Sequence, residues 1–148
     1  MHRKIPKKII EFIFNHHVLT LATFGGNIPY CSNCFYAYNQ DENYFVCLSD
    51  TTTKHIKDLQ FSNKVAISIV LETEKIGKIQ GLQINATMEK PLNNTIKKEV
   101  KKIYLKRFPY AIIKNTEIWI IKPYFMKYTD NRLGFGKKII WGQLDEKD

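Results

Sequence analysis

The chain has 148 residues, of which 23 are basic and 14 acidic, so its formal net charge is +9. With 44% hydrophobic residues, 7 glycines and 5 prolines, the composition is that of one folded domain spanning residues 1–148. It excludes a multidomain, collagen-like or broadly disordered protein. No apolar run approaches the length of a membrane span, and we therefore expect no membrane partner.

The first half of the chain predicts a helix, three strands and a second helix. Residues 6–15 carry Ile9, Ile10, Ile13 and Phe14 at helical spacing, which predicts an amphipathic helix with a proline in its first turn. Strands are expected over residues 18–24, 29–38 and 44–49, because these runs are β-branched or aromatic and are separated by turn residues. A helix capped by Asp50 or a following threonine is expected to run to about residue 61.

The second half predicts further strands and one long helix. Strands are expected over residues 65–71, 79–88, 117–121, 125–128 and 137–141. A lysine-rich helix is expected from about Leu92 to Arg107, before Pro109, with its lysines on a solvated face. Consecutive short strands with interspersed helices predict a mainly β protein with helices, built on an antiparallel barrel or closed sheet.

The basic residues and the cysteines indicate which binding partners and which cellular compartment to expect. Only three basic residues are arginine, the residue that duplex-reading surfaces favour, so nucleic acid is not the expected partner. Three cysteines and no secretory signal predict a reduced, cytoplasmic setting. Cys31 and Cys34 have the spacing of a metal or redox pair, but no second Cys/His pair completes a four-ligand site. We therefore expect ordinary strand cysteines and no metal site.

The segment from Ser49 to His55 is the candidate for binding chemistry. A predicted strand ends at Ser49, and Asp50-Thr-Thr-Thr-Lys-His55 leads into a predicted helix. Hydroxyls and free backbone N–H groups at a helix start, beside Lys54 and His55, would converge on an anion such as phosphate. A threonine-capped helix with a solvated first turn explains the same residues without any ligand.

From Asn33 to about Met88, the chain resembles the flavin-binding half of the pyridoxamine 5′-phosphate oxidase-like split-barrel superfamily. The likeness rests on Leu48-Ser49 at a strand end, on Thr53-Lys54-His55 at a helix start, and on the passage from Asp58 to Ser68. The basic pair of the family, which holds the phosphate of FMN, falls on Lys54 and His55.

Further positions of this family match the chain. Its flavin-edge strand falls on Asn33, Cys34, Phe35 and Tyr36, and a glutamine that is offered to the flavin matches Gln80. The segment from Tyr128 to Trp141, together with Arg107-Phe-Pro109, closely resembles the YhbP-type branch, and the likeness then covers nearly the whole chain.

This resemblance implies a six-stranded antiparallel split barrel that forms a homodimer, with FMN between the subunits. The implied cofactor-binding residues are Asn33, Cys34, Phe35, Tyr36, Leu48, Ser49, Thr53, Lys54, His55, Gln80 and Trp141. The resemblance also places Trp141 or Phe135 of a partner chain near the ring, and plain packing is the alternative for both. The 9 Phe, 8 Tyr and 2 Trp residues exceed what one small core needs and fit an isologous interface.

Two differences from the oxidases of this superfamily limit which of their properties we expect in this chain. The Arg-Lys pair common in the oxidases is Lys54-His55 here. A phosphate would therefore meet one group that is charged at neutral pH, Lys54, and one whose charge depends on pH, His55. The oxidases' C-terminal substrate-binding segment has no counterpart, so we do not expect the oxidase reaction.

Three functions remain open at this point. The first is an FMN-dependent oxidoreductase of unidentified substrate, and the second is a non-enzymatic flavin- or nucleotide-binding carrier or sensor. The third, less favoured, is a nucleic-acid binder that uses the lysine-rich helix. His16 and His17 end the first helix, where a protonated imidazole would suit the helix dipole. A haem ligand is the alternative for these histidines.

Overall fold

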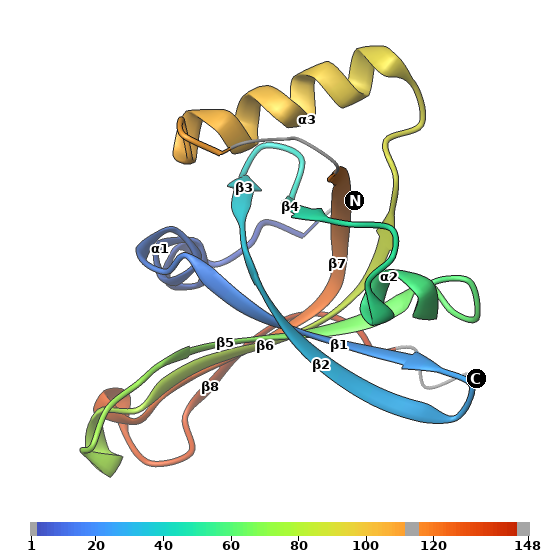
Figure 1. The fold of residues 1–148 in the computed structure, drawn as a ribbon. Helices are drawn as coiled ribbons and strands as arrows, with labels where there is room; N and C mark the ends of the chain where they lie inside the picture. Colours follow the sequence, from blue (N-terminus) through green and yellow to red (C-terminus); the bar gives the residue numbers. More distant parts are fainter. Residues whose placement is uncertain (1–2, 112–115, 145–148) are drawn as a thin grey trace.

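The protein was analysed as a computed structural model that describes residues 3–111 and 116–144. Within these ranges, eight strands form one antiparallel sheet that three α-helices accompany (Figure 1). The elements in chain order are α1 (Lys7–Asn15), β1 (Val18–Gly25), β2 (Ile28–Phe35), β3 (Ala37–Asn39), β4 (Tyr44–Ser49), α2 (Lys54–Asp58), β5 (Lys64–Leu71), η1 (Ile76–Lys78), β6 (Gln80–Glu89), α3 (Asn94–Arg107), β7 (Glu117–Asp130), η2 (Asn131–Leu133) and β8 (Lys138–Gly142).

The sheet curls so that its two outermost strands are neighbours in the chain. The strand order is β2-β1-β5-β6-β7-β4-β3, and β8 pairs with β7. Strands β2 and β3 are joined by Tyr36, whose backbone N–H donates to the carbonyl of His17 (2.9 Å). The expected mainly β, antiparallel fold class with helices is confirmed. The sheet contains eight strands in the described residues, where six were expected.

Strand β7 is the place where the sheet divides. Its residues 117–121 pair with β4 and its residues 125–129 pair with β8, while β6 pairs with both parts. Pro123 lies between the two parts, next to a register shift at Asn85 and Ala86 of β6. Proline lacks a ladder N–H and bulges bend strands, so β7 bends here without ending. The two strands expected over 117–121 and 125–128 are therefore one, and the strand expected over 29–38 is two.

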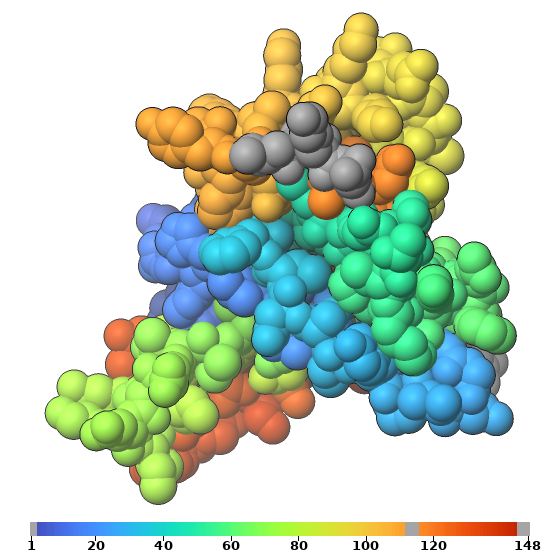
Figure 2. Space-filling view, in the orientation of Figure 1, coloured from blue at the N-terminus to red at the C-terminus, as the bar shows by residue number. Residues whose placement is uncertain are grey.

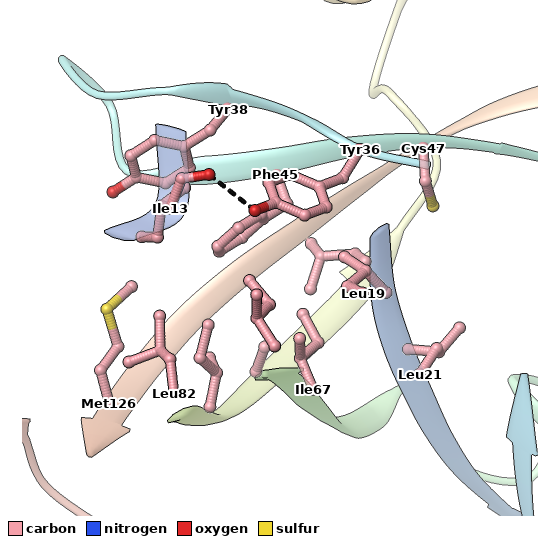
Figure 3. Close-up of a cluster of buried hydrophobic side chains, with 14 of the residues drawn as sticks. Ile13, Leu19, Leu21, Tyr36, Tyr38, Phe45, Cys47, Ile67, Leu82 and Met126 are labelled. Atoms are coloured by element: carbon pink, nitrogen blue, oxygen red, sulfur yellow. Dashed lines mark hydrogen bonds between the residues drawn. The ribbon is translucent and has the colours of Figure 1, made fainter. Parts of the chain in front are cut away.

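A large apolar core lies between the curled sheet and α1. It gathers inward-facing side chains of β1, β4, β5, β6 and β7, together with Ile9, Ile10, Phe12 and Ile13 of α1 (Figure 3). Burying one large apolar side chain contributes about 1.5–3 kcal/mol, so this cluster is the main source of stability. Phe14 was expected to be buried but is 44% exposed, and Phe12 is buried instead. The reason is that Phe12 lies three residues after Ile9, on the side of α1 that faces the core.

Helix α3 covers a second, smaller core. Its Val100 and Tyr104 are buried against β3, β4 and β7, while most of its lysines are exposed, as the sequence predicts. Arg107 ends this helix and ties it to the rest of the fold. Its guanidinium donates to three backbone carbonyls, those of Phe14, His16 and Tyr36.

Candidate functional site

The turn between β4 and α2 brings Ser49, Thr53 and His55 together. The Ser49 hydroxyl lies 2.7 Å from Nε2 of His55, and both residues are buried. The Thr53 hydroxyl is 3.4 Å from the same nitrogen. The Ser49 carbonyl accepts a hydrogen bond from the Trp119 indole N–H (3.2 Å). Three predicted site residues therefore form one hydrogen-bonded network.

The other hydroxyls of this turn bond back to Asp50. The Asp50 carboxylate accepts from the backbone N–H and the hydroxyl of Thr52, at 2.8 Å each, and the Thr53 hydroxyl donates to the Asp50 carbonyl. Helix α2 begins at Lys54 without a side-chain cap and ends at Asp58. The expected cap and the expected helix end near residue 61 are therefore wrong, because an Asx turn takes the place of the first helical turn.

Lys54 forms an ion pair with Asp58, one helical turn later. Its ammonium lies 2.5 Å from Oδ1 of Asp58, whose side chain is only 3% exposed. The other carboxylate oxygen accepts from the buried Thr23 hydroxyl of β1 (2.8 Å). The hydrogen bond from Lys54 lowers the pKa of Asp58. The Lys54 side chain stays 42% exposed, 5.5 Å above the Tyr30 ring of β2, so it reaches the surface although its charge is partly balanced.

Burial determines the charge of His55, the second residue of the Lys54-His55 pair. It lowers the pKa of His55 below its ordinary value of 6.5, and the nearby Asp58 opposes this only in part. The imidazole is therefore mainly neutral at pH 7, and the positive charge of the pair rests on Lys54. Burial also lowers the pKa of His16. The expected protonated imidazole at the end of α1 is therefore not favoured at His16.

The four predicted residues at the end of β2 lie at different depths. Asn33 is exposed, and its side-chain oxygen accepts from the Thr20 hydroxyl (2.8 Å). Phe35 is 58% exposed, whereas Cys34 and Tyr36 are buried in the large core. The Tyr36 hydroxyl donates to the Ile13 carbonyl (2.6 Å), the dashed contact in Figure 3. Only Asn33 and Phe35 thus present their side chains outward.

Strand β2 and α2 form one continuous surface. Figure 2 shows the blue-to-cyan β2 region beside the green α2 region on one face of the molecule. On the side of β2 away from β1, no other strand of the described residues pairs with it. Backbone N–H and C=O groups along this edge therefore lack ladder partners, and the Tyr30 ring of the same strand lies 5.5 Å from the Lys54 ammonium.

Three predicted residues do not share this surface. Leu48 packs against the core under α3. Gln80 lies at the opposite end of the sheet, because it pairs with Asp130 at one end of β7 whereas Ser49 pairs with Glu117 at the other. Trp141 is buried in the chain's own core and its indole N–H donates to the Arg3 carbonyl (2.6 Å). For Trp141, the structure thus shows the packing alternative, while Phe135 is 79% exposed.

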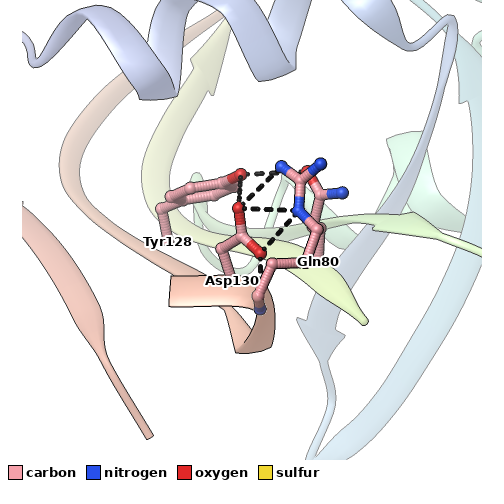
Figure 4. Close-up of polar contacts among 4 residues, drawn as sticks. Gln80, Tyr128 and Asp130 are labelled. Carbon is pink, nitrogen blue, oxygen red and sulfur yellow. Dashed lines mark hydrogen bonds and ion pairs between the residues drawn. The ribbon is translucent and has the colours of Figure 1, made fainter. Parts of the chain in front are cut away.

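The C-terminal motif surrounds a buried carboxylate. Arg132 donates through Nε and Nη2 to Asp130, and the Tyr128 hydroxyl contacts both Asp130 (3.3 Å) and Gln80 (3.0 Å) (Figure 4). The hydrogen bonds from Arg132 lower the pKa of Asp130, whose side chain is 3% exposed. This network fixes the turn after β7 and engages the side-chain oxygen of Gln80.

Sequence reasoning missed three neighbours of the site. Asp58 lies at an i,i+4 spacing from Lys54, a signal of an ion pair on a helix that was available in the sequence. Thr23 and Trp119 come from other strands, β1 and β7, and gave no such signal.

A cavity of about 390 Å³ lies between α2 and Trp119, with Thr51 of the β4–α2 turn in its lining, and one of about 410 Å³ lies beside Phe108. Neither is lined by Ser49, Lys54 or His55. Among residues 3–111 and 116–144, no group of three or more His, Cys, Asp or Glu side chains could hold a metal ion. No helix in these ranges is long and apolar enough to cross a membrane.

Several solved structures of other bacterial proteins are similar to this chain in fold. A heme binding protein from Mycobacterium smegmatis has a TM-score of 0.71 and 15% identity, covering 88% of this chain but 55% of its own, so this chain spans about half of that protein. An FAD-binding protein from Mesorhizobium loti has a TM-score of 0.68 and 12% identity, covering 84% and 94%. A Clostridium acetobutylicum protein of the pyridoxinephosphate oxidase family, related to general stress protein 26, has a TM-score of 0.66 and 16% identity, covering 91% and 92%. The fold is that of the pyridoxamine 5′-phosphate oxidase-like split barrels.

Sequence relatives are bacterial proteins of nearly the same length. No family model matches the chain. A UPF0306 protein from Photorhabdus laumondii is 37% identical over 133 residues, which cover 90% of this chain and 92% of the relative. A UPF0306 protein from Cronobacter sakazakii is 32% identical over 141 residues, covering 93% and 95%. Identity at this level over nearly both full lengths shows that the chain belongs to the UPF0306 family.

Proposed function

We propose that this chain is a YhbP-type member of the split-barrel superfamily that binds FMN as a homodimer and acts as a flavin-dependent oxidoreductase. One observation carries the proposal: Lys54 and the hydroxyl-rich turn lie on an open face beside the unpaired edge of β2. The flavin- and heme-binding names among proteins of this fold support a cofactor on the same scaffold. Three free cysteines support a reduced, cytoplasmic setting.

Lys54 is the residue that would hold the phosphate. An ammonium group has three N–H donors, and the contact with Asp58 uses one of them. The exposed hydroxyls of Thr51 and Thr52 lie three and two residues before it, and that of Thr52 already donates to the Asp50 carboxylate. A hydrogen bond to a charged group contributes about 1.5–3 kcal/mol, so Lys54 and the Thr51 hydroxyl support the anchoring of a dianionic headgroup. The residues present therefore fit the phosphate, with His55 as a neutral hydrogen-bonding partner.

The free edge of β2 would orient the ring. Its unpaired backbone groups can exchange hydrogen bonds with the polar edge of a flat heteroaromatic ring, and Asn33 and Phe35 project beside them. Bound FMN would supply the electron- and hydride-transfer chemistry, and the protein would position it and control access.

A homodimer would close this open face. The outer face of β2, β1, β5 and β6 carries small or uncharged side chains in register: Thr20 lies between Asn33 and Ser68, and Ala22 lies between Cys31 and Ala66. In a chain with net charge +9, such an uncharged area is typical of an isologous interface. Asn33 belongs to this area, on the opposite face of β2 from Tyr30 and Lys54, so a partner subunit packed here would cover the Asn33 side of the free strand edge.

One observation favours a second candidate. His55 and Asp58, the side chains of the cluster best suited to proton transfer, are buried. A non-enzymatic flavin- or nucleotide-binding carrier or sensor would need no such group at its surface. The two candidates share the binding site and differ only in turnover.

A visible spectrum of the natively purified protein tests the proposal, followed by titration with added FMN. Flavin bands support it, a Soret band identifies haem instead, and a colourless protein that takes up no FMN contradicts it. FMN at a hundredfold excess over Kd should stabilise the fold by about 2.7 kcal/mol. Turnover of the bound flavin with a nicotinamide donor and an electron acceptor separates the oxidoreductase from the carrier.

A matched pair of variants tests the site. Lys54→Ala should raise the Kd for FMN by about tenfold or more, because one charge-assisted hydrogen bond is lost. Lys57→Ala removes an exposed lysine from the same helix and should leave Kd unchanged. Equal effects of the two variants contradict the assignment. Salt-sensitive nucleic-acid binding that survives Lys54→Ala would instead support the lysine face of α3.

A further inference from the structure

The cavity between α2 and Trp119, called here the Trp119 cavity, is lined by residues of the large core. Its volume is about 390 Å³. Ile56 of α2, Met88 of β6 and Trp119 of β7 line it, and all three are buried members of that core. Small-molecule sites are typically cavities of this size with apolar walls and a few polar groups. The Trp119 cavity therefore has an apolar floor on which a small ligand can lie.

Two polar side chains at this cavity have unused hydrogen-bonding capacity. The Lys90 ammonium lies 5.4 Å from the centre of the Trp119 ring, and none of the ion pairs among the described residues includes it. Within the same residues, the Gln60 side-chain amide makes no hydrogen bond. Both side chains are exposed and line the cavity. An anion bound here would accept one charge-assisted hydrogen bond from Lys90 and a second bond from the Gln60 amide.

Helix α2 separates the Trp119 cavity from the proposed phosphate site. Ile56 follows Lys54 by two residues, about 200° around the helix axis, so the two side chains leave α2 on nearly opposite sides. Lys54 lies over the Tyr30 ring of β2, whereas Ile56 packs into the core and lines the cavity. A ligand in the cavity therefore leaves Lys54 and the edge of β2 free, and the inference does not depend on a flavin.

We propose that the Trp119 cavity binds a small, flat aromatic carboxylate. Its ring lies against Met88 and Trp119, because thioether and indole groups both make favourable contacts with aromatic rings. Its carboxylate meets Lys90, which can turn from the Trp119 ring toward the ligand because its side chain is exposed. A single ammonium balances a single negative charge, so a carboxylate fits this cavity better than a dianionic phosphate.

Calorimetric titration of the full chain with 2-naphthoate tests the proposal, and 2-naphthamide is the matched ligand without a charge. We expect a Kd for 2-naphthoate of about 1 mM or lower. The Kd for 2-naphthamide should be about tenfold higher or more, because its contact with Lys90 carries no charge on the ligand side. Equal binding of the two ligands, or no binding of either, overturns the proposal. Tighter binding of decanoate, a flexible carboxylate, contradicts the preference for a flat ring.

A matched pair of lysine variants tests the charged contact. Lys90→Met keeps an unbranched apolar side chain but removes the ammonium, so it should raise the Kd for 2-naphthoate by about tenfold or more and leave that for 2-naphthamide unchanged. Lys57→Met removes an exposed lysine of α2 that does not line the cavity, and both Kd values should stay unchanged. Equal effects of the two variants contradict the role of Lys90.

The two tryptophans locate the ligand in the unaltered chain. On titration with 2-naphthoate, the indole N–H resonance of Trp119 should shift, while that of Trp141, which bonds the Arg3 carbonyl outside the cavity, should not. The variant Trp141→Phe assigns the two resonances. A shift of Trp141 alone, or of neither resonance, places the ligand elsewhere and overturns the proposal.

Competition separates this site from the proposed cofactor site. Saturating FMN, or the variant Lys54→Ala, should leave the Kd for 2-naphthoate unchanged, because α2 lies between the two sites. Loss of 2-naphthoate binding in either experiment assigns the anion to the Lys54 surface and overturns the inference, while the proposed flavin site stands. Gln60→Trp, at an exposed position, should fill the cavity and abolish binding of both naphthalene ligands. Undiminished binding in a folded Gln60→Trp chain contradicts the assigned site.

Discussion

Gly25, at the end of β1, leaves space that Asp58 uses. A Cβ atom at position 25 would lie 2.8 Å from the Asp58 Cγ and 3.0 Å from its Cα, closer than unstrained Cβ contacts. The Asp58 carboxylate is held in this position by Lys54 and by the buried Thr23 hydroxyl. We predict that Gly25→Ala displaces Asp58 and breaks both contacts, because neither α2 nor β1 can move without disturbing the core.

The expected cost follows from overpacking. Inserting a methyl group into a packed site costs about 1–3 kcal/mol. In a chain of this size, that lowers Tm by about 2–12 °C. Gly77→Ala is the matched control, because a Cβ there would meet no atom within 4 Å. Its free energy of unfolding should stay within about 0.5 kcal/mol of wild type.

Urea unfolding followed by tryptophan fluorescence measures both variants. Repeating Gly25→Ala in an Asp58→Ala background completes a double-mutant cycle, in which the cost of the added methyl group should shrink. Equal stability of Gly25→Ala and Gly77→Ala would refute the steric reasoning. An undiminished cost in the Asp58→Ala background would show that the strain does not come from the Asp58 side chain.

Three further perturbations test other parts of the structure. Burial lowers the pKa of His55, so as the pH falls through 6.5 the unfolded chain takes up a proton at this histidine before the folded chain does. The free energy of unfolding should therefore drop on acidification, and it should drop less in His55→Gln. Urea titrations at several pH values measure this difference. Arg107→Lys loses the forked contacts to three backbone carbonyls, so its free energy of unfolding should fall by about 1–3 kcal/mol. Thermal unfolding measures this loss, and an unchanged Tm would contradict the role of Arg107. Ala66→Arg places a charge in the proposed interface and should yield monomers in sedimentation velocity, whereas Thr95→Arg on the exposed start of α3 should not.

Local patterns in the amino-acid sequence account for most of the secondary structure and for the fold class. The apolar spacing of α1, the proline after α3 and the β-branched runs are local signals, and the corresponding elements form close to their predicted bounds. The lysine face of α3 was predictable for the same reason, because a helix sorts polar and apolar side chains by position alone. Local signals failed at Pro123, where a bulge lets β7 continue, and at Asp50, where a turn replaces the helix start.

Which of the candidate side chains contact each other depends on how the strands and helices pack. Lys54 and His55 were recognisable as a basic pair, but the Asp58 contact and the burial of His55 reduce it to one partly balanced charge. Gln80 was expected to contact the flavin of the same cofactor whose phosphate Lys54 and His55 would hold, yet strand register places it at the far end of β7 from Ser49. Such contacts are set by strand register and sheet curvature, which are fixed by the packing of the whole core and are not encoded in any short segment.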